Sequence, residues 1–173
     1  MPDNVILRPL QISDAEALAE ASSRNRTFLQ PWEPVRPESF YTVDGQRARL
    51  ADSMAEQDAG RSFFWALFDG DTVVGRISLT DVVRGAFENG NLGYWVAETH
   101  QGLGLATAAA RNVCDFAVQL GLHRLQAGTL VHNAGSQTVL ARCGFTRIGL
   151  AENYIRIDGR WQDHVLFQKI LHG

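Results

Sequence analysis

The chain of 173 residues is long enough to bury one sizeable core and lies within the usual length of a single domain. Hydrophobic residues make up 45% of it and charged residues 20%, a composition that excludes collagen-like, disordered and disulfide-stapled proteins. The formal net charge of −3 excludes a global attraction to nucleic acid or to an anionic membrane. We therefore expect one domain over residues 1–173.

The cysteines, the histidines and the opening residues argue against a metal site and a leader. Cys114 and Cys143 are too far apart for a zinc motif, and the five histidines show no paired spacing, so we expect two reduced thiols and no metal. Met1 to Val5 include Asp3 and lack a basic segment followed by an apolar one. No apolar run is long enough to span a bilayer. These features predict a cytoplasmic protein with no membrane and no direct nucleic-acid partner.

Hydrophobic periodicity predicts one strand, two helices and a hairpin in the first half of the chain. The capping-box pattern of Ser13 to Glu16 predicts a helix that begins near Asp14. The segment Phe28 to Pro37 carries three prolines and two large aromatics, which predicts irregular backbone. It is either a loop pinned by Trp32 or one wall of a substrate mouth. In chain order we predict a strand over 5–7, a helix from about 14, a helix over 43–59, and strands over 62–68 and 72–79 joined by a turn at 69–71.

The period of the pattern changes after the loop-like stretch 81–90. Leu105, Ala109, Val113 and Phe116 recur at steps of three or four, which predicts an amphipathic helix ended by Gly121. This helix lies between strands expected over 91–97 and 125–131, so the order predicts a right-handed crossover between parallel neighbours. The fold class is therefore α/β. The remaining predictions are a short helix over 136–142, a strand that begins at 145–148, and a last hairpin of 155–157 and 161–171.

Several residues in strand-like segments are expected to have structural roles. Trp65, Trp95 and Trp161 are predicted to pack on the sheet or in the core. Asp163 and His164 lie in the closing strand, where a structural hydrogen bond is the expected role.

The junction from His100 to Thr107 reads His-Gln-Gly-Leu-Gly-Leu-Ala-Thr. Glycines let the backbone approach a ligand, and a helix start directs unpaired N–H groups and a favourable dipole toward anions. The junction is either a phosphate loop or a tight strand-to-helix turn. A dinucleotide site is disfavoured because the third small residue is missing and Arg124 stands where an acid is needed about twenty positions on. A Walker loop is excluded because no Gly-Lys-Ser/Thr follows.

This loop resembles that of the GCN5-related N-acetyltransferases (GNAT). Gln101 to Ala106 fits their pattern Gln/Arg-x-x-Gly-x-Gly/Ala. Asn133-Ala-Gly-Ser136, followed by Cys143-Gly-Phe145, is similar to the second acyl-CoA segment of the ribosomal-protein N-terminal acetyltransferase branch. Segments 25–36, 82–87, 92–94 and 157–165 extend the resemblance, to the RimJ type of ribosomal-protein alanine acetyltransferase, over nearly the whole chain.

The resemblance implies a GNAT fold, in which a mixed, mostly antiparallel sheet of six to seven strands carries a β-α-β acetyl-CoA-binding crossover and helices on both faces. It implies acetyl-CoA as co-substrate and transfer of acetyl to the N-terminal α-amine of a protein, a ribosomal protein being one candidate. Two alternatives stay open: a small-molecule amine as acceptor, such as an antibiotic or an aminoacyl compound, and a non-catalytic acyl-CoA-binding regulator. The sequence does not decide between a monomer and a homodimer.

The resemblance also implies roles for individual residues around acetyl-CoA. Ser136 would act as general acid to the departing thiolate, although a serine there is also a common helix N-cap. Asn133 would contact the cofactor arm. Backbone N–H groups of one strand would stabilise the thioester oxygen. The full set is Gln101, Gly102, Leu103, Gly104, Leu105, Ala106 and Thr107 at the pyrophosphate, and Val96, Ala97 and Glu98 beside the pantetheine arm.

On the acceptor side, Trp32 and Glu33 are the expected substrate-binding residues. Some relatives place a glutamate, as general base, where Ile155 stands in this sequence, so Glu152, Asn153, Glu33 or a water are the candidate bases. An α-amine of pKa about 7.7 to 8.0 is roughly 10 to 20% neutral at pH 7, whereas a lysine is neutral only to about 0.04%. An enzyme without a strong base therefore suits an N-terminus better than a lysine.

Overall fold

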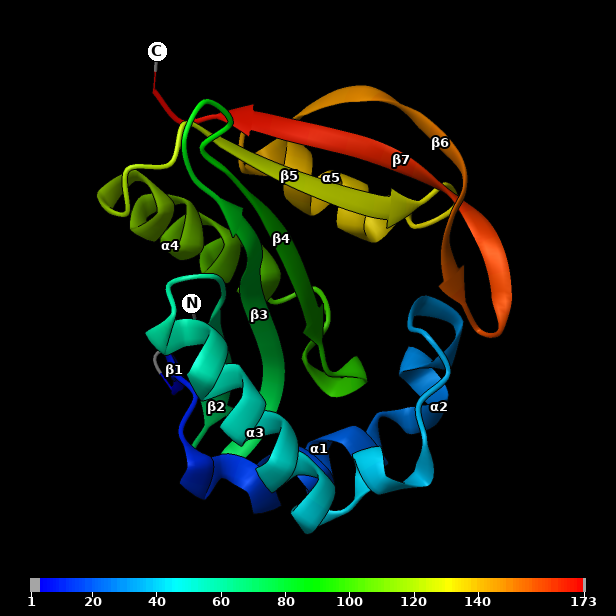
Figure 1. Ribbon diagram of the computed structural model, residues 1–173. Coiled ribbons are helices and arrows are strands. Elements are labelled where there is room, and N and C mark those ends of the chain that lie inside the picture. Colours follow the sequence, from blue (N-terminus) through cyan, green and yellow to red (C-terminus); the bar gives the residue numbers. More distant parts are fainter. Residues whose placement is uncertain (1–3, 173) are drawn as a thin grey trace.

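The computed structural model describes residues 4–172 and contains one seven-stranded mixed sheet in the order β1-β2-β3-β4-β5-β7-β6 (Figure 1). Met1 to Asp3, which entered the argument about a leader, lie outside the described residues. The six-to-seven-strand prediction for the sheet is confirmed. The strands are β1 (Val5–Pro9), β2 (Phe63–Asp69), β3 (Thr72–Val83), β4 (Asn89–Val96), β5 (Arg124–Leu130), β6 (Thr146–Ile157) and β7 (Arg160–Ile170).

Helices cover both faces of the sheet, as expected (Figure 1). The α-helices are α1 (Ala15–Arg24), α2 (Arg26–Leu29), α3 (Val43–Asp58), α4 (Leu105–Gln119) and α5 (Ala134–Arg142). Short 3-10 turns are η1 (Ile12–Asp14), η2 (Gln30–Trp32), η3 (Glu38–Tyr41) and η4 (Glu98–His100). Leu18 of α1 and Leu50 of α3 are buried on one face against Phe68, while Ala110 of α4 and Leu140 of α5 are buried on the other face.

The predicted crossover places α4 between the parallel neighbours β4 and β5. These strands pair only at Asn89–Arg124, Gly90–Leu125 and Asn91–Gln126. Beyond Asn91 they diverge, and Figure 1 shows the two strands leaving each other in a V. The sheet therefore contains an opening at the carboxyl end of β4, next to the start of α4.

Two local predictions need correction. The capping pair at the first turn is Gln11 with Asp14, because the Asp14 carboxylate accepts the Gln11 N–H at 2.8 Å; the pattern at Ser13 to Glu16 is not used. The segment Phe28 to Pro37 is helical in its first part, since α2 and η2 extend to Trp32 despite Pro31. Proline fits there because it occupies the first turn of η2, where its missing N–H is not needed.

Residues 4–172 bear on what the sequence predicts about cysteines, membrane spans and metal sites. Cys114 and Cys143 are free, buried thiols, as predicted. Within these residues, no helix has the length and apolarity to cross a membrane, and no group of three or more His, Cys, Asp or Glu side chains could hold a metal ion.

Candidate active site

A cavity of about 440 Å³ opens between the end of β4, the start of α4 and α5. Most of the residues expected around acetyl-CoA line it: Val96, Gln101, Gly102, Gly104, Leu105, Ala106, Thr107, Asn133 and Ser136. Ala97, Glu98 and Leu103 are not among its lining residues, and Leu103 is exposed to solvent. We call this space the donor cavity.

The glycine loop at the start of α4 has the backbone of an anion-binding site. Gly102 and Gly104 have φ angles of 77° and 75°, in the left-handed region that side chains disfavour, and Gly104 is the N-cap of α4. A Cβ at either glycine would meet no atom within 4 Å, so the loop faces open space. The side chain of Gln101 donates to the Val96 carbonyl at 2.6 Å and so ties the loop to the end of β4.

The donor cavity fits a diphosphate followed by a narrow chain. The first-turn N–H groups of α4 and its dipole favour negative charge at the glycine loop. Arg142, at the end of α5, lines the same cavity and adds a positive charge. Val96, Leu105 and Val139 supply apolar walls for an acyl arm. The N–H groups, the arginine and the apolar walls of the donor cavity therefore match the phosphates and pantetheine of a coenzyme A thioester.

Of the three strand amides expected at the thioester oxygen, two have partners inside the protein. The Ala97 N–H donates to the Val74 carbonyl at 2.8 Å, and the Glu98 N–H donates to the Asn25 side chain at 3.2 Å. Since successive residues of a strand direct their N–H groups to opposite sides, the Val96 N–H points away from β3, toward the opening beside β5. Val96 is thus the amide of the three that remains directed into the site.

Ser136 does not cap its helix. Asn133 is the N-cap of α5, and its side-chain oxygen accepts the Ser136 N–H at 3.0 Å, which leaves the serine hydroxyl for another role. The Tyr94 hydroxyl lies 2.9 Å from the Ser136 hydroxyl oxygen. Burial raises the pKa of Tyr94 to about 12, against a smaller lowering by the hydrogen bond with Ser136, so the phenol stays protonated at neutral pH.

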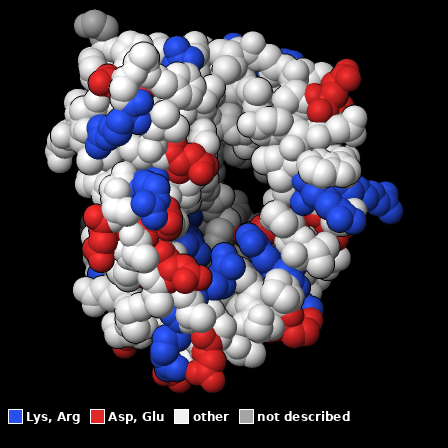
Figure 2. All heavy atoms as spheres, viewed as in Figure 1, with Lys and Arg blue, Asp and Glu red and all other residues white. Residues whose placement is uncertain are grey.

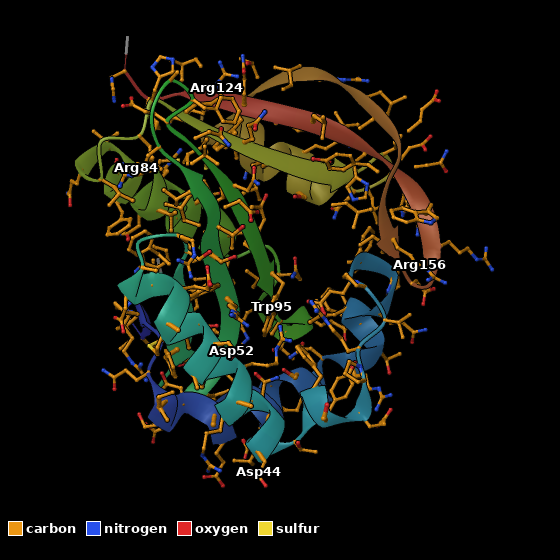
Figure 3. All side chains as sticks on the ribbon, viewed as in Figure 1. Asp44, Asp52, Arg84, Trp95, Arg124 and Arg156 are labelled. Carbon is orange, nitrogen blue, oxygen red and sulfur yellow. The ribbon has the colours of Figure 1, made fainter. Side chains whose placement is uncertain are left out.

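A second, smaller cavity of about 170 Å³ adjoins the donor cavity; we call it the acceptor cavity. Trp95 and Leu29 line both cavities, and Figure 3 labels Trp95 where β4 faces the opening toward α2. The space-filling view shows a deep hollow through this part of the molecule, with Lys and Arg atoms gathered at its lower rim (Figure 2). Leu29 and Trp95 thus form a wall that the two cavities share.

The structure separates the two residues expected at the substrate. Trp32 lines the donor cavity, with its ring 5.5 Å from that of His132, whereas Glu33 lines the acceptor cavity. The Glu33 carboxylate is 3.5 Å from the Arg36 Nε. Asp158, from the turn between β6 and β7, is a second carboxylate of the acceptor cavity.

The other candidate bases lie away from both cavities. Glu152 and Asn153 are exposed on β6, and the Asn153 N–H donates to the Asp163 carboxylate at 2.9 Å. Ile155 is also exposed on this strand. The described residues that line the donor cavity include no Asp or Glu. Glu33 and Asp158, in the acceptor cavity, are therefore the carboxylates placed near an incoming amine.

The structural expectations for the closing strand are confirmed except at one tryptophan. Asp163 accepts the Asn153 N–H, and the buried His164 bonds through Nδ1 to the Gln162 carbonyl at 3.0 Å. Trp65 is buried in the core, but Trp161 is 63% exposed and packs in no core. The packing prediction for Trp161 was wrong because β7 passes the end of the sheet there, where β6 is its partner and no helix covers the ribbon.

Three residues of the site escaped the sequence reasoning: Tyr94, Trp95 and Arg142. Tyr94 and Trp95 are consecutive on β4, so their side chains leave on opposite faces. Tyr94 contacts Ser136 on the α5 side, and Trp95 packs partly against the α1 and α3 side. Two adjacent aromatic residues in a predicted strand are the only sequence signal for Tyr94 and Trp95. The separation of β4 from β5, beside which they lie, depends on the position of β5 and cannot be predicted from this segment.

Comparisons with known proteins agree with this geometry. The family model of the GNAT acetyltransferase domain matches residues 4–146. The [Ribosomal protein uS5]-alanine N-acetyltransferase of Escherichia coli K12 is 38% identical over 95% of this chain and 86% of its own length. The crystal structure of ribosomal-protein-S5-alanine acetyltransferase from Vibrio fischeri superposes with a TM-score of 0.94, at 32% identity over 98% of this chain and 94% of that one. RimJ of Mycobacterium smegmatis, in complex with CoA-disulfide, superposes with a TM-score of 0.90, at 32% identity over 96% of this chain and 81% of that one. With its glycine loop, its β4–β5 opening and these relatives, the chain belongs to the GNAT family and is an acetyl-CoA-dependent N-acetyltransferase.

Proposed function

We propose that this enzyme transfers acetyl to the N-terminal α-amine of a protein, with an alanine-like first residue and a ribosomal protein as the acceptor class. The observation that carries the proposal is the meeting of the donor and acceptor cavities at Trp95. An amine that enters through the acceptor cavity reaches the strand end beside Val96 without crossing the glycine loop. The relatives named for ribosomal protein uS5 support this choice of acceptor.

When bound, acetyl-CoA supplies the acetyl thioester. The protein's part is to hold the two reactants together in one orientation, which alone supplies much of the rate of a direct transfer. The Val96 N–H would stabilise the charge that develops on the thioester oxygen. Backbone amides of the glycine loop would anchor the phosphates.

Ser136 would donate the proton that the departing thiolate takes up. Its hydroxyl does not cap α5. The protonated Tyr94 hydroxyl lies 2.9 Å from the serine hydroxyl, where either can donate, and 3.2 Å from the Ser136 backbone carbonyl, to which it also donates. A hydrogen bond received by a hydroxyl oxygen makes the remaining O–H a better donor. Tyr94 is therefore a positioning residue for Ser136 in this proposal.

The lack of a carboxylate in the donor cavity supports an α-amine as acceptor. A lysine would need a strong base to reach its neutral form at pH 7, while an α-amine is already neutral to about a tenth or more. Glu33 and Asp158 can accept the proton that the amine releases or pass it to water. This chemistry would take place in the cytoplasm, where the acceptor is made.

The proposal is tested with acetyl-CoA and two synthetic peptides, one with a free N-terminal alanine and one N-blocked but rich in lysine. Thiol release is followed in time, and the product is located by mass spectrometry. We expect acetylation of the α-amine of the first peptide and none on the second. Efficient acetylation of the blocked peptide would contradict the N-terminal assignment. Release with neither peptide, despite measurable acetyl-CoA binding, would redirect the search to a small-molecule amine or to a binding role.

A further inference from the structure

Three arginines meet on the acceptor side of the sheet, and we call them the arginine cluster. Arg36 and Arg49 both lie over the ring of Phe40, with their guanidinium carbons 4.8 and 5.0 Å from its centroid. Arg76 lies on β3, where its partner in the register with β4 is Trp95. Directly opposed residues of antiparallel strands project from the same face. Arg76 therefore projects from the sheet beside the tryptophan that lines both cavities.

The three arginines of the cluster differ in their carboxylate partners. Only Arg36 forms an ion pair, with Glu33, and its Nε is a buried donor without a hydrogen-bond partner. Arg49 and Arg76 form no ion pair within residues 4–172, although the charge of Asp52 on the same helix attracts Arg49. Paired arginines elsewhere are Arg8 with Asp14, Arg24 with Glu20, Arg26 with Glu38, Arg47 with Asp44 and Arg61 with Glu56.

The positive charges of the cluster act on one another. Burial lowers the pKa of Arg76 to about 10, and the charges of Arg49 and Arg36 add to that lowering. Burial also lowers the pKa of Arg49, again with a contribution from Arg36. Partly buried like charges are unfavourable unless a counter-charge lies among them. Glu33 and Asp52 offset only part of this charge, so the site favours an anion from outside.

The position of the cluster indicates which molecule brings the anion. Arg36 lines the acceptor cavity, and Trp95 connects that cavity with the donor cavity. Of the three arginines, Arg36 lines the acceptor cavity while Arg49 and Arg76 do not, so an anion that reaches Arg36 from the cavity belongs to the molecule whose amine is acetylated. Glu33 and Asp158 line the same cavity and would attract the cationic N-terminus of that molecule.

We propose that the arginine cluster binds the carboxylate of an acidic side chain within the first few residues of the acceptor peptide. A carboxylate is planar and matches the paired N–H groups of a guanidinium. The apolar walls from Leu29, Pro34 and Val35 suit the remaining atoms of an extended peptide. The inference rests on the proposed function, since it assigns sequence selectivity to an enzyme that acts on N-termini.

Binding to two matched peptides tests the inference. Both begin with a free alanine; one carries glutamate and the other glutamine at positions two to four. Isothermal titration should show that the protein binds the glutamate peptide more tightly by about tenfold or more. The preference should be lost in Arg49→Gln and in Arg76→Gln, and it should shrink with added NaCl because salt screens the charges. Arg47→Gln is the matched control, because Arg47 lies on the same helix and is paired with Asp44.

Each outcome decides between the inference and an alternative. Equal binding of the two peptides by the unaltered protein overturns the inference, as does a preference that survives both cluster substitutions in folded protein. Arg49→Gln changes an exposed helix position, so a folded variant is available even if Arg76→Gln unfolds. Aminoethyl phosphate is the third ligand to compare. If the protein binds it more tightly than the glutamate peptide, and Arg49→Gln removes this binding, the acceptor is a phosphorylated amine and the inference is overturned. The proposed function is judged separately, by acetylation of the glutamine peptide, which does not need the cluster.

Discussion

The hydroxyl groups of Tyr94 and Ser136 lie 2.9 Å apart, although the two residues come from β4 and α5, 42 positions apart in the chain. A buried phenol with a pKa near 12 and a serine released from capping by Asn133 form a proton-donating pair at the donor cavity. Trp95, the neighbour of Tyr94 on β4, lines both this cavity and the acceptor cavity. In the proposed mechanism, the serine hydroxyl of this pair is the acid that protonates the departing thiolate.

Replacement of Ser136 by alanine should lower turnover and leave acetyl-CoA binding intact. General acid catalysis contributes about 10² to 10⁴ in rate, so we expect a loss well above tenfold in kcat. Tyr94→Phe should lower kcat by a smaller factor, because it removes only the hydrogen bond that positions the serine. Steady-state kinetics and titration with acetyl-CoA measure the two effects. Thr146→Ala removes an exposed hydroxyl from β6 and is the control. Unchanged turnover in Ser136→Ala would remove the serine from the mechanism.

The pH dependence of the reaction should follow the acceptor and not the tyrosine. With a peptide that begins with alanine, kcat/KM should rise as its α-amine loses a proton and level off above about pH 9. Burial keeps the pKa of Tyr94 near 12, so the phenol remains a donor. The rate should therefore show no decrease at any pH up to about 10. A descending limb between pH 8 and 10 would show that the Tyr94–Ser136 pair titrates earlier than this structure implies.

Two substitutions distinguish a phosphate-binding role of the glycine loop from the backbone strain that a side chain causes at any glycine with positive φ. Gly104→Ala places a side chain at a φ of 75°, and Gly121→Ala does so at 77° just after α4, at the opposite end of that helix from the glycine loop. Each should lower the free energy of unfolding by about 1 to 2 kcal/mol. Only Gly104→Ala should also weaken acetyl-CoA binding, because its Cβ projects into the space of the phosphates. Urea unfolding and ligand titration measure both quantities, and equal affinities in the two variants would contradict a phosphate loop.

The buried carboxylate of Asp14 should stabilise the fold in a pH-dependent way. Burial by itself would raise the pKa of Asp14, but hydrogen bonds from Arg8 and from the Gln11 N–H, with the Arg8 charge, hold it below its usual value. Because the folded-state pKa is depressed, this stability is complete above the unfolded pKa of about 3.9 and is lost as pH falls through the folded value.

Asp14→Asn should accordingly lower the free energy of unfolding by about 1 to 3 kcal/mol at pH 7, and by less at pH 3. Asp44→Asn breaks an ion pair whose carboxylate is 92% exposed (Figure 3) and should change stability by no more than about 0.5 kcal/mol. Urea titrations at both pH values compare the variants. An Asp14→Asn effect that grew at acid pH would reverse the assigned sign.

Local hydrophobic periodicity was sufficient to predict those helices and strands in which a single period continues from one end to the other. The 3.6-residue spacing from Leu105 to Phe116 and the glycines around it gave α4 and the loop, and Asn133 and Ser136 entered through a family resemblance. Asn133 and not Ser136 became the cap because the asparagine oxygen reaches the N3 amide. That choice depends on where α5 begins, and the boundary moved by two residues from the expected one.

Relations between distant strands could not be obtained in this way. Arg76 and Trp95 lie side by side because β3 and β4 pair in one register, and nothing in either segment states that register. The engagement of the Glu98 amide by Asn25 links residues 73 positions apart. Ten of the twelve residues that line the acceptor cavity come from the segment 22–41, but Trp95 and Asp158 close it from distant strands, and the sequence of that segment does not indicate them.

The V between β4 and β5 also concerns the stability of the empty enzyme. β4 and β5 pair at three positions and then separate. Backbone N–H and C=O groups that would bond to each other in a regular sheet therefore face solvent beyond this point. In the proposed binding mode, the amide-bearing arm of acetyl-CoA would lie in the V and take the place of a missing strand. Loading should therefore raise the melting temperature and slow amide exchange at the free ends of both strands, by mass action on the folded state. Substrate supply would then set the lifetime of the protein as well as its rate.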